Sequence, residues 1–286
     1  MEDTSSAHDI PGILQRDSGK GSPAGDGQSG LDRLVVGLVR RGVTPNGVSW
    51  AGFVCAALAA LCLVRGAGHA LPLEGHLIGV PSSWWPFAAA FFLLLSSIAD
   101  LLDGAVARRG GLMTHYGALL DSTLDRFADM ALFSACALYF ASAGNLTYVL
   151  LACAGLAAAV QTSYVKARGE NMTEGLGVGF WQRGERIGCL GVGAVTGHMA
   201  TSLWLLGIFP FFTVARRVLE ARRRMEGGDA ETARPSRWMP WRQSRRTLDY
   251  RIFVSAIILL IFVSPWLSSF FRGLADPLST LLGRVS

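Results

Sequence analysis

The sequence predicts an all-α integral membrane protein, and three observations support this: the composition, the long apolar stretches and the placement of the basic residues. Of the 286 residues, 51% are hydrophobic and only 16% are charged, whereas about a quarter of the residues in an average soluble domain are charged. About 20 helical residues cross the roughly 30 Å hydrocarbon layer of a bilayer. Membrane helices are predicted at 46–66, 84–107, 116–141, 146–166, 185–199, 202–221 and 251–271, of which the fifth is short.

The basic residues follow the pattern expected for a chain whose N-terminus lies in the cytoplasm. In that orientation only Arg65, Arg272 and Arg284, among the 26 Lys and Arg residues, fall on the outer side. Cytoplasmic loops of membrane proteins carry an excess of Lys and Arg. The sequence therefore predicts a multi-pass protein of the inner (cytoplasmic) cell membrane and argues against the opposite orientation.

Four regions are predicted along the chain. Residues 1–30 are polar and rich in Gly, Ser and Asp, which predicts a disordered cytoplasmic tail. The membrane domain is expected at 31–224 and begins with an amphipathic stretch, 31–41, predicted to lie on the membrane surface. The arginine-rich segment 225–250 is predicted to be a cytoplasmic linker near anionic lipid head groups, with no nucleic acid as partner. Residues 251–286 add a seventh transmembrane helix and a C-terminal tail.

Four aspartates stand out because they lie in helices that are otherwise apolar. An ionised Asp at the centre of a membrane helix costs about 2.5–3.5 kcal/mol on insertion scales. Asp100 and Asp103 nevertheless close the second predicted helix, and Asp121 and Asp125 open the third. The i, i+3 and i, i+4 spacings put each pair on one helix face, with Cβ atoms about 5–6 Å apart. The short loop between the helices makes them antiparallel, so both pairs are expected to converge at the cytoplasmic end.

A cation is expected where four carboxylates converge, since unit charges ~4 Å apart interact by about 4 kcal/mol at an effective dielectric of 20. Oxygen ligands without Cys or His favour a hard ion, and we predict Mg²⁺ or Mn²⁺, with Ca²⁺ a further candidate. Such ions could hold a diphosphate and polarise the attacked phosphorus. The structural alternative is that Arg108, Arg109 and Arg126 neutralise the acids at the wet end of a helical hairpin.

The spacing of these residues resembles the signature of the CDP-alcohol phosphotransferase family. The pattern reads Asp100-x₂-Asp103-Gly104-x₂-Ala107-Arg108-x₈-Gly117-x₃-Asp121-x₃-Asp125, and all eight defined positions agree. The resemblance covers about residues 31–224, including the interfacial stretch and the Thr44-Pro45-Asn46 start of the first membrane helix. It implies a six-helix bundle of that family's type with an N-terminal interfacial helix, here followed by an appended seventh transmembrane helix.

The resemblance also implies a reaction and a role for each residue of the pattern. The metal ligands would be Asp100, Asp103, Asp121 and Asp125. Asp125 would in addition be catalytic, as the general base on the acceptor hydroxyl. The CDP pocket would be shaped by Gly104, Ala107, Arg108 and Gly117. The phosphatidyl group of CDP-diacylglycerol would pass to an alcohol with release of CMP, in an active site that faces the cytoplasm, and the family suggests a homodimer.

A second resemblance concerns the acceptor. Residues 163–170 and 178–186 are similar to segments of bacterial phosphatidylinositol phosphate synthases, in which basic residues bind the phosphate of inositol 1-phosphate. By position, the residues implied here are Lys166, Arg186 and Arg217. Basic side chains near the metal suit a phosphorylated polyol, because Arg binds phosphate oxygens bidentately. The alternative is that these residues only flank the cytoplasmic ends of membrane helices.

Two other functions fit parts of the pattern. Glycerol 3-phosphate, the acceptor of a phosphatidylglycerophosphate synthase, would need the same basic clamp. A metal-ion transporter could also carry intramembrane acids, but it would be expected to place them near mid-membrane on several helices. The sequence therefore favours an enzyme of phospholipid biosynthesis, with inositol 1-phosphate as the expected acceptor.

Overall fold

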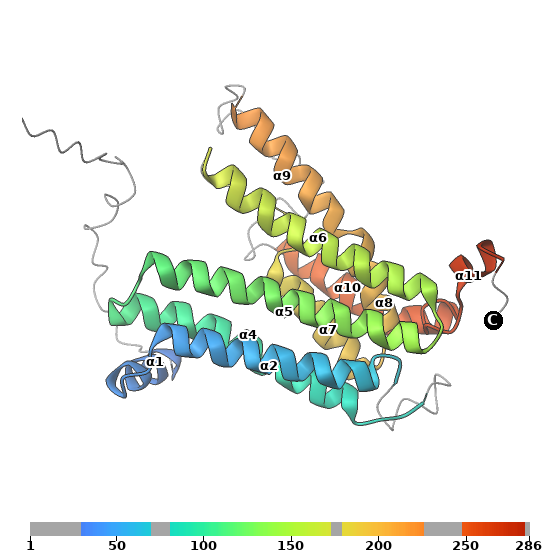
Figure 1. Ribbon diagram of the computed structural model, residues 1–286, viewed down its shortest axis with the longest axis horizontal. Coiled ribbons are helices and arrows are strands. Elements are labelled where there is room, and N and C mark those ends of the chain that lie inside the picture. The colour runs from blue at the N-terminus through green and yellow to red at the C-terminus, as the bar shows by residue number, and fades with distance from the viewer. Residues whose placement is uncertain (1–29, 70–80, 173–178, 226–247, 284–286) are drawn as a thin grey trace, which may run out of the picture.

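The computed structural model describes residues 30–69, 81–172, 179–225 and 248–283, and its elements there are α-helices. The helices are α1 (Gly30–Arg40), α2 (Pro45–Gly66), α4 (Trp85–Gly110), α5 (His115–Ser142), α6 (Leu146–Glu170), α7 (Arg183–Thr196), α8 (Met199–Ile208), α9 (Pro210–Met225), α10 (Leu248–Leu267) and α11 (Pro277–Leu281) (Figure 1). The predicted N-terminal tail and nearly all of the predicted basic linker lie outside the described residues.

Several of these helices can cross a membrane. Among the described residues, five are long and apolar enough to do so by length and composition, namely Pro45–Gly66, Trp85–Gly110, Leu146–Glu170, Met199–Met225 and Tyr250–Leu267. α5 is 28 residues long, but its first half carries the acids described below. α7 has only 14 residues, as expected for the short fifth prediction. The predicted all-α membrane fold is confirmed.

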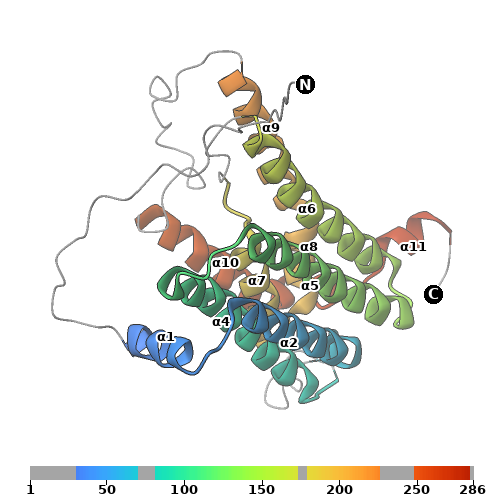
Figure 2. The same cartoon turned by 60° about the vertical axis from the view of Figure 1, so that its left-hand side comes forward.

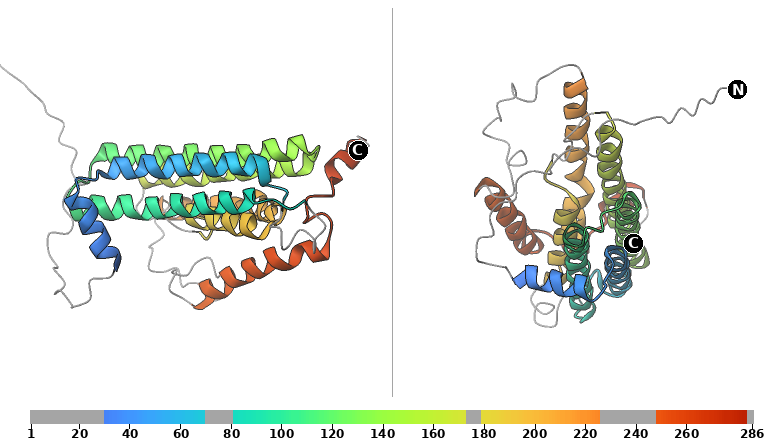
Figure 3. Two further views of the ribbon diagram at one scale, coloured as in Figure 1. Left: turned by 90° about the horizontal axis from the view of Figure 1, so that it is seen from below. Right: turned by 90° about the vertical axis from the view of Figure 1, so that its left-hand side faces the viewer.

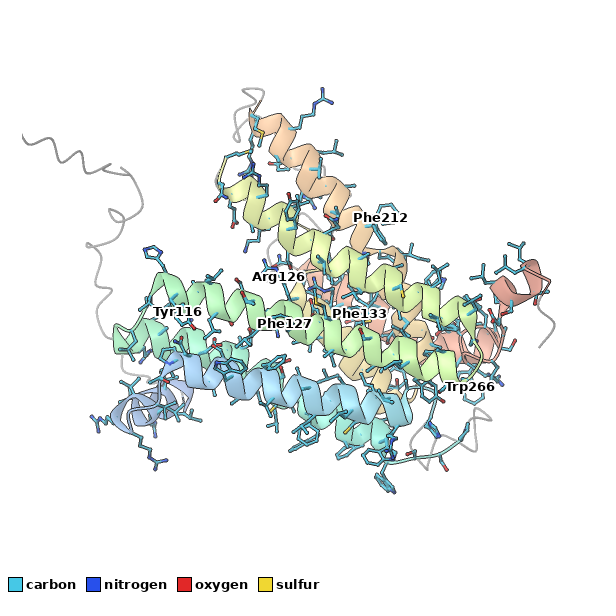
Figure 4. The ribbon with its side chains drawn as sticks, viewed as in Figure 1. Tyr116, Arg126, Phe127, Phe133, Phe212 and Trp266 are labelled. Atoms are coloured by element: carbon cyan, nitrogen blue, oxygen red, sulfur yellow. The ribbon has the colours of Figure 1, made fainter. Side chains whose placement is uncertain are left out.

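The bundle is built on close contacts between α2, α4, α5 and α6. α2 packs against both α4 and α5, which run beside it, and α5 packs against α6 (Figure 1). Small residues allow the approach: a Cβ added to Gly155 of α6 would lie 2.5 Å from the ring of Phe133, which is buried between α5 and α6 (Figure 4). Small residues at such crossings let membrane helices pack closely. The result is a rigid frame for the ends of α4 and α5.

The turn between α4 and α5 is set by local sequence. Gly111 has a φ of +62° and ends α4 in the left-handed conformation, which favours glycine. The Thr114 hydroxyl then accepts a hydrogen bond from the Gly117 N–H at 2.9 Å and caps the first turn of α5. The end of α4, the start of α5, the start of α2 and the short helix α1 all lie at one end of the bundle (Figure 2). Both aspartate pairs are therefore brought near that end.

One predicted helix is divided in the structure. The sequence predicts a single helix over 202–221, whereas α8 ends at Ile208 and α9 begins at Pro210. Proline has no N–H to donate and its ring clashes with the preceding turn, so it breaks or kinks a helix. The prediction of one regular helix was wrong at this point, although Met199–Met225 together remain long enough to cross a membrane.

The predicted seventh helix is found as α10, which ends at Leu267 rather than at 271. It lies along the outside of the bundle, against α7 and α8 (Figure 3). Beyond it, the chain folds back over the start of α6. The side-chain N–H groups of Asn145 donate to the carbonyl oxygens of Gly273 at 3.0 Å and Ala275 at 3.1 Å. The C-terminal segment is thus anchored to the start of α6.

Candidate metal centre and substrate cavities

The four aspartates meet at one small cavity between α2, α4, α5 and α7. Asp100, Asp121 and Asp125 each offer a carboxylate oxygen, and these atoms lie within 4.8 Å of one another. Asp103 lines the same cavity, but its carboxylate also accepts hydrogen bonds from the Ser49 hydroxyl at 2.8 Å and from the Gly104 N–H at 2.5 Å. Ser49 thus orients Asp103 from the neighbouring helix α2.

A cation from α7 meets the cluster. One guanidinium nitrogen of Arg183 lies 2.7 Å from a carboxylate oxygen of Asp100 and 2.9 Å from one of Asp125. A single guanidinium among four carboxylates leaves most of their negative charge uncompensated. The structural alternative assigned neutralisation of the acids to Arg108, Arg109 and Arg126, whereas the ion pairs with Asp100 and Asp125 come from Arg183.

The donor set fits a hard divalent cation. The converging ligand atoms are carboxylate oxygens from two helices, and Mg²⁺ and Mn²⁺ prefer such ligands. The residues that would hold the ion are the predicted Asp100, Asp103, Asp121 and Asp125. The metal assignment of these four residues remains a proposal, and their convergence on one cavity is what it rests on.

The predicted CDP-binding residues lie together beside the acids. A cavity of about 160 Å³ is lined by Asp103 and Asp121 together with residues from the starts of α2 and α5 and the end of α4. Its lining includes all four predicted residues, Gly104, Ala107, Arg108 and Gly117. A Cβ built on Gly104 would lie 3.1 Å from the Arg108 guanidinium, and one on Gly117 would lie 3.0 Å from the Thr114 hydroxyl, so a larger residue at either position would crowd this edge of the acid cluster.

A basic cavity opens on the other side of the acids. It measures about 380 Å³ and is lined by basic residues from α5, α6, α7 and α9 and by four acids, Asp121, Asp125, Asp129 and Glu170. The basic lining consists of Arg126, Lys166, Arg183, Arg186 and Arg217. Arg126 projects from α5 where α6 passes over it (Figure 4). The three predicted acceptor residues are thus brought to one cavity.

The predicted acceptor residues differ in how they are held. Lys166 is about half exposed and lies 4.0 Å from Glu170. Arg186 is buried and forms an ion pair of 2.5 Å with Asp129 of α5. Arg217 is buried and donates to the Thr162 carbonyl oxygen. Both guanidinium groups are therefore fixed by the fold, whereas the lysine has room to move.

Besides Ser49, sequence reasoning missed the roles of two charged residues that line these cavities. Asp129 was not predicted, although it follows Asp125 by one helical turn and is a further acid in an apolar helix. Arg183 was seen only as part of a resembling segment, and its pairing with Asp100 and Asp125 requires α7 to pack near α4 and α5. The signal for Asp129 was present in the helical spacing, whereas the role of Arg183 depends on tertiary structure.

A fourth cavity, of about 520 Å³, is mostly apolar and lies between α4, α7 and α10. Its polar edge includes Asp100 and Arg183, which also line the acid cavity. Its apolar lining includes Leu101 of α4, Ile187 of α7 and Val254 of α10. Each of these four cavities, among the residues that the structure describes, is thus lined by at least one of the four aspartates.

An all-helical membrane bundle with a carboxylate cluster between a glycine-lined and an arginine-lined cavity is suited to an enzyme that acts on phosphate esters. A family model described as CDP-alcohol phosphatidyltransferase matches residues 42–222. The chain belongs to this family of transferases of phospholipid biosynthesis, as the sequence resemblance implied. The match ends before α10.

Individual relatives point in the same direction. The phosphatidylinositol phosphate synthase of Cutibacterium acnes is 35% identical over 186 residues, which cover 64% of this chain and 79% of the relative. A crystal structure of the Mycobacterium tuberculosis phosphatidylinositol phosphate synthase with CDP-DAG bound is 27% identical, with a TM-score of 0.56, and the match covers 67% of this chain and 92% of that chain. A crystal structure of the same enzyme in complex with manganese and citrate is 26% identical, with a TM-score of 0.53, over 67% of this chain and 88% of that one.

Proposed function

We propose that this protein transfers the phosphatidyl group of CDP-diacylglycerol to a hydroxyl of inositol 1-phosphate, giving phosphatidylinositol phosphate and CMP. The observation that carries the proposal is the basic cavity, in which Asp121 and Asp125 face Lys166, Arg186 and Arg217. A phosphorylated polyol needs basic side chains to bind its phosphate and a carboxylate near one of its hydroxyls. The basic cavity is lined by residues of both kinds.

The atoms of the acceptor site suit a phosphate. Within the described part of the chain, the buried Nε atoms of Arg183 and Arg186 have no hydrogen-bond partner. A buried N–H group without a partner is costly, and phosphate oxygens accept hydrogen bonds from guanidinium groups in bidentate geometry. The Asp129 carboxylate holds Arg186 in place for this role.

The nucleotide half would bind on the opposite side of the acids. The diphosphate of the CDP-lipid would lie at the acid cluster, with the cytidine beside Gly104, Ala107, Arg108 and Gly117. A bound Mg²⁺ or Mn²⁺ supplies charge neutralisation and polarises the phosphorus under attack. Asp100, Asp103 and Asp121 would hold that ion, and the Ser49 hydroxyl keeps Asp103 in position.

The reaction requires one proton transfer by the protein. The acceptor oxygen attacks the lipid-side phosphorus, the bond from that phosphorus to the bridging oxygen breaks, and CMP leaves with the bridging oxygen. Asp125 accepts the proton of the acceptor hydroxyl as general base, which in enzymes accelerates reactions by about 10²–10⁴-fold. Asp121 and Asp125 both line the acid cavity and the basic cavity, and the family resemblance gives the role of base to Asp125.

The proposal includes a location. The excess of basic residues at the end of the bundle that carries the acids favours an active site that faces the cytoplasm, in the inner cell membrane. The water-soluble acceptor would then enter from the cytoplasm, and CMP would leave to it. The structure contains one chain, so the homodimer suggested by the family resemblance stays a prediction.

The test is an acceptor screen with product identification. Purified protein with CDP-diacylglycerol and Mg²⁺ or Mn²⁺ is supplied in turn with inositol 1-phosphate, glycerol 3-phosphate, free inositol and serine. We expect CMP release and a lipid carrying the inositol phosphate head group only with inositol 1-phosphate. Preferential use of glycerol 3-phosphate would assign the protein instead as a phosphatidylglycerophosphate synthase, and preferential use of an unphosphorylated alcohol would remove the role of the basic cavity.

A further inference from the structure

Helix α10 stands outside the region matched by the family model, which ends at residue 222, yet it is fixed to the bundle at two places. At one end the Tyr250 hydroxyl donates to a carboxylate oxygen of Glu185 on α7 at 3.0 Å. Towards the other end, the fully buried hydroxyls of Thr201 on α8 and Ser264 on α10 lie 2.7 Å apart. A helix held in this way has a defined position against α7 and α8.

Between these two contacts, α10 and α7 do not pack closely enough to exclude a cavity. The gap is the 520 Å³ cavity, to which α10 contributes Tyr250, Val254, Ile257 and Ile258. On the α7 side, Gly188 lines the cavity, and a Cβ built there meets nothing within 4 Å. The absence of a side chain at Gly188 therefore leaves space that α10 covers from the other side.

The chemistry of the lining indicates what the cavity takes. One edge is formed by Asp100 and Arg183, which also line the acid cavity where the diphosphate would bind. The remainder is largely apolar, and α4 and α10 are both long and apolar enough to cross a membrane. A ligand that occupies both parts needs a phosphate end and a hydrocarbon end in the same molecule, and apolar pockets of this kind bind by burying hydrocarbon.

We propose that α10 is the outer wall of a binding cavity for an acyl chain of the CDP-lipid, and that its side chains help to set which chain lengths the enzyme accepts. This inference rests on the proposed function, because it takes CDP-diacylglycerol as the donor substrate. The acyl chain enters beside Asp100 and runs between Gly188 of α7 and Val254 of α10. The Tyr250–Glu185 hydrogen bond holds the start of α10 against α7 at the edge of the cavity.

Two substitutions narrow the cavity from opposite sides, and each has a matched control. Val254→Phe adds bulk from α10, while Val263→Phe makes the same change on the same helix at a residue that is 41% exposed and does not line the cavity. Gly188→Leu adds bulk from α7. Gly191→Leu is its control, because a Cβ at Gly191 also meets nothing within 4 Å and Gly191 does not line the cavity.

The measurement is CMP release with CDP-dioctanoylglycerol and with CDP-dipalmitoylglycerol, reported as the ratio of kcat/KM for the two lipids. We expect Val254→Phe and Gly188→Leu each to shift the ratio about tenfold towards the short-chain lipid, which is the discrimination that a methylene or two gives in an apolar pocket. Both controls should keep the ratio of the unaltered protein. Because the readout is a ratio, a loss of folded protein lowers both rates and leaves it unchanged.

The outcomes separate this inference from the proposed function. If the unaltered protein releases no CMP from either lipid, the proposed function itself fails. If it does so but Val254→Phe leaves the ratio unchanged, α10 is not a wall of the acyl-chain cavity, whatever Gly188→Leu does. A shift of equal size in Val263→Phe would also overturn the inference, since that residue faces away from the cavity.

Discussion

The acid cluster and the basic cavity lie on two sides of Asp121 and Asp125, but they are assembled differently. The acids come from two consecutive helices joined by a short turn, so their approach follows from local sequence. The basic residues come from α5, α6, α7 and α9, and their approach requires the whole bundle to fold. The acids also crowd one another, whereas the buried Arg186 has a carboxylate partner in Asp129.

This difference separates the reaction from its specificity. In the proposed function the acid cluster would carry out the transfer, and the local hairpin that forms the cluster can be predicted from spacing alone. The basic cavity would select the acceptor, and its side chains depend on packing among helices distant in sequence. Perturbing the first should stop the reaction, and perturbing the second should change how well the acceptor is used.

Metal removal should have the largest effect on the acid cluster. Treatment of the purified protein with a chelator is expected to abolish CMP release, because the carboxylates would then face the diphosphate without a cation between them. Added Mg²⁺ or Mn²⁺ should restore the rate measured before treatment. Undiminished CMP release in thoroughly chelated protein would contradict the proposed metal centre.

Asp125→Asn should have the next largest effect. The amide cannot accept the proton of the acceptor hydroxyl, so kcat is expected to fall by about 10²–10⁴-fold. Asp276→Asn makes the same chemical change at a residue that lines none of the described cavities, and it should leave kcat unaltered. Full activity of Asp125→Asn in the acceptor-dependent assay would sink the general-base role.

A smaller effect is expected on the basic side. Lys166→Ala removes a half-exposed charge without creating a core defect, and the KM for the phosphorylated acceptor should rise by about 10–100-fold, as for the loss of a charged hydrogen bond. The KM for CDP-diacylglycerol should not change. Arg168→Ala, on an exposed residue of the same helix outside the cavity, is the control. Equal acceptor KM values in the two variants would remove Lys166 from the proposed site.

The smallest effect is expected on stability, from substitution of Asp276. Its carboxylate accepts several hydrogen bonds, so it serves as a comparison for the four acids that crowd one another. Asp276 caps α11 and accepts the N–H groups of Leu146 at 2.8 Å and Thr147 at 3.0 Å. Partial burial raises its pKa, but hydrogen bonds from Ser279, Thr147 and Leu146 outweigh this and hold the pKa well below its usual range. Asp276→Ala should lower the free energy of unfolding by about 0.5–2 kcal/mol, the range for loss of a helix cap.

The pH dependence of that effect has a definite sign. A carboxyl whose pKa is lowered on folding stabilises the protein fully above its unfolded pKa of about 3.9, and the contribution is lost as the pH falls through the folded pKa. Thermal unfolding should therefore show the largest difference between Asp276→Ala and the unaltered protein near neutral pH and a smaller one in acid. A difference that grows in acid would contradict this account. Asp276→Asn, which keeps a capping oxygen, should lose less.

Much of the fold was predictable because membrane helices are marked by long apolar runs. The ends of α2, α4 and α5 agree with the predictions to within a few residues, and the turn between α4 and α5 follows from Gly111 and Thr114. The break between α8 and α9 was missed, although Pro210 marks it. Hydropathy alone does not register such a break, since both sides of it are apolar.

The candidate site was predictable to the extent that its residues are close in sequence. The four aspartates and the glycines beside them share one hairpin, so spacing placed them correctly beside one another. The pairing of Arg183 with Asp100 and Asp125, and of Arg186 with Asp129, joins helices far apart in the chain. No periodicity within one helix can specify which partner helix lies opposite.

The return of the chain from α10 to the start of α6 has a consequence for biogenesis. A chain is synthesised from its N-terminus, and its early segments begin to assemble first. All four aspartates and the predicted acceptor residues precede α10, so the reacting groups are complete before the contacts of Asn145 with Gly273 and Ala275 can form. A chain that ended after α9 would contain all the proposed site residues but would lack the last wall of the 520 Å³ cavity.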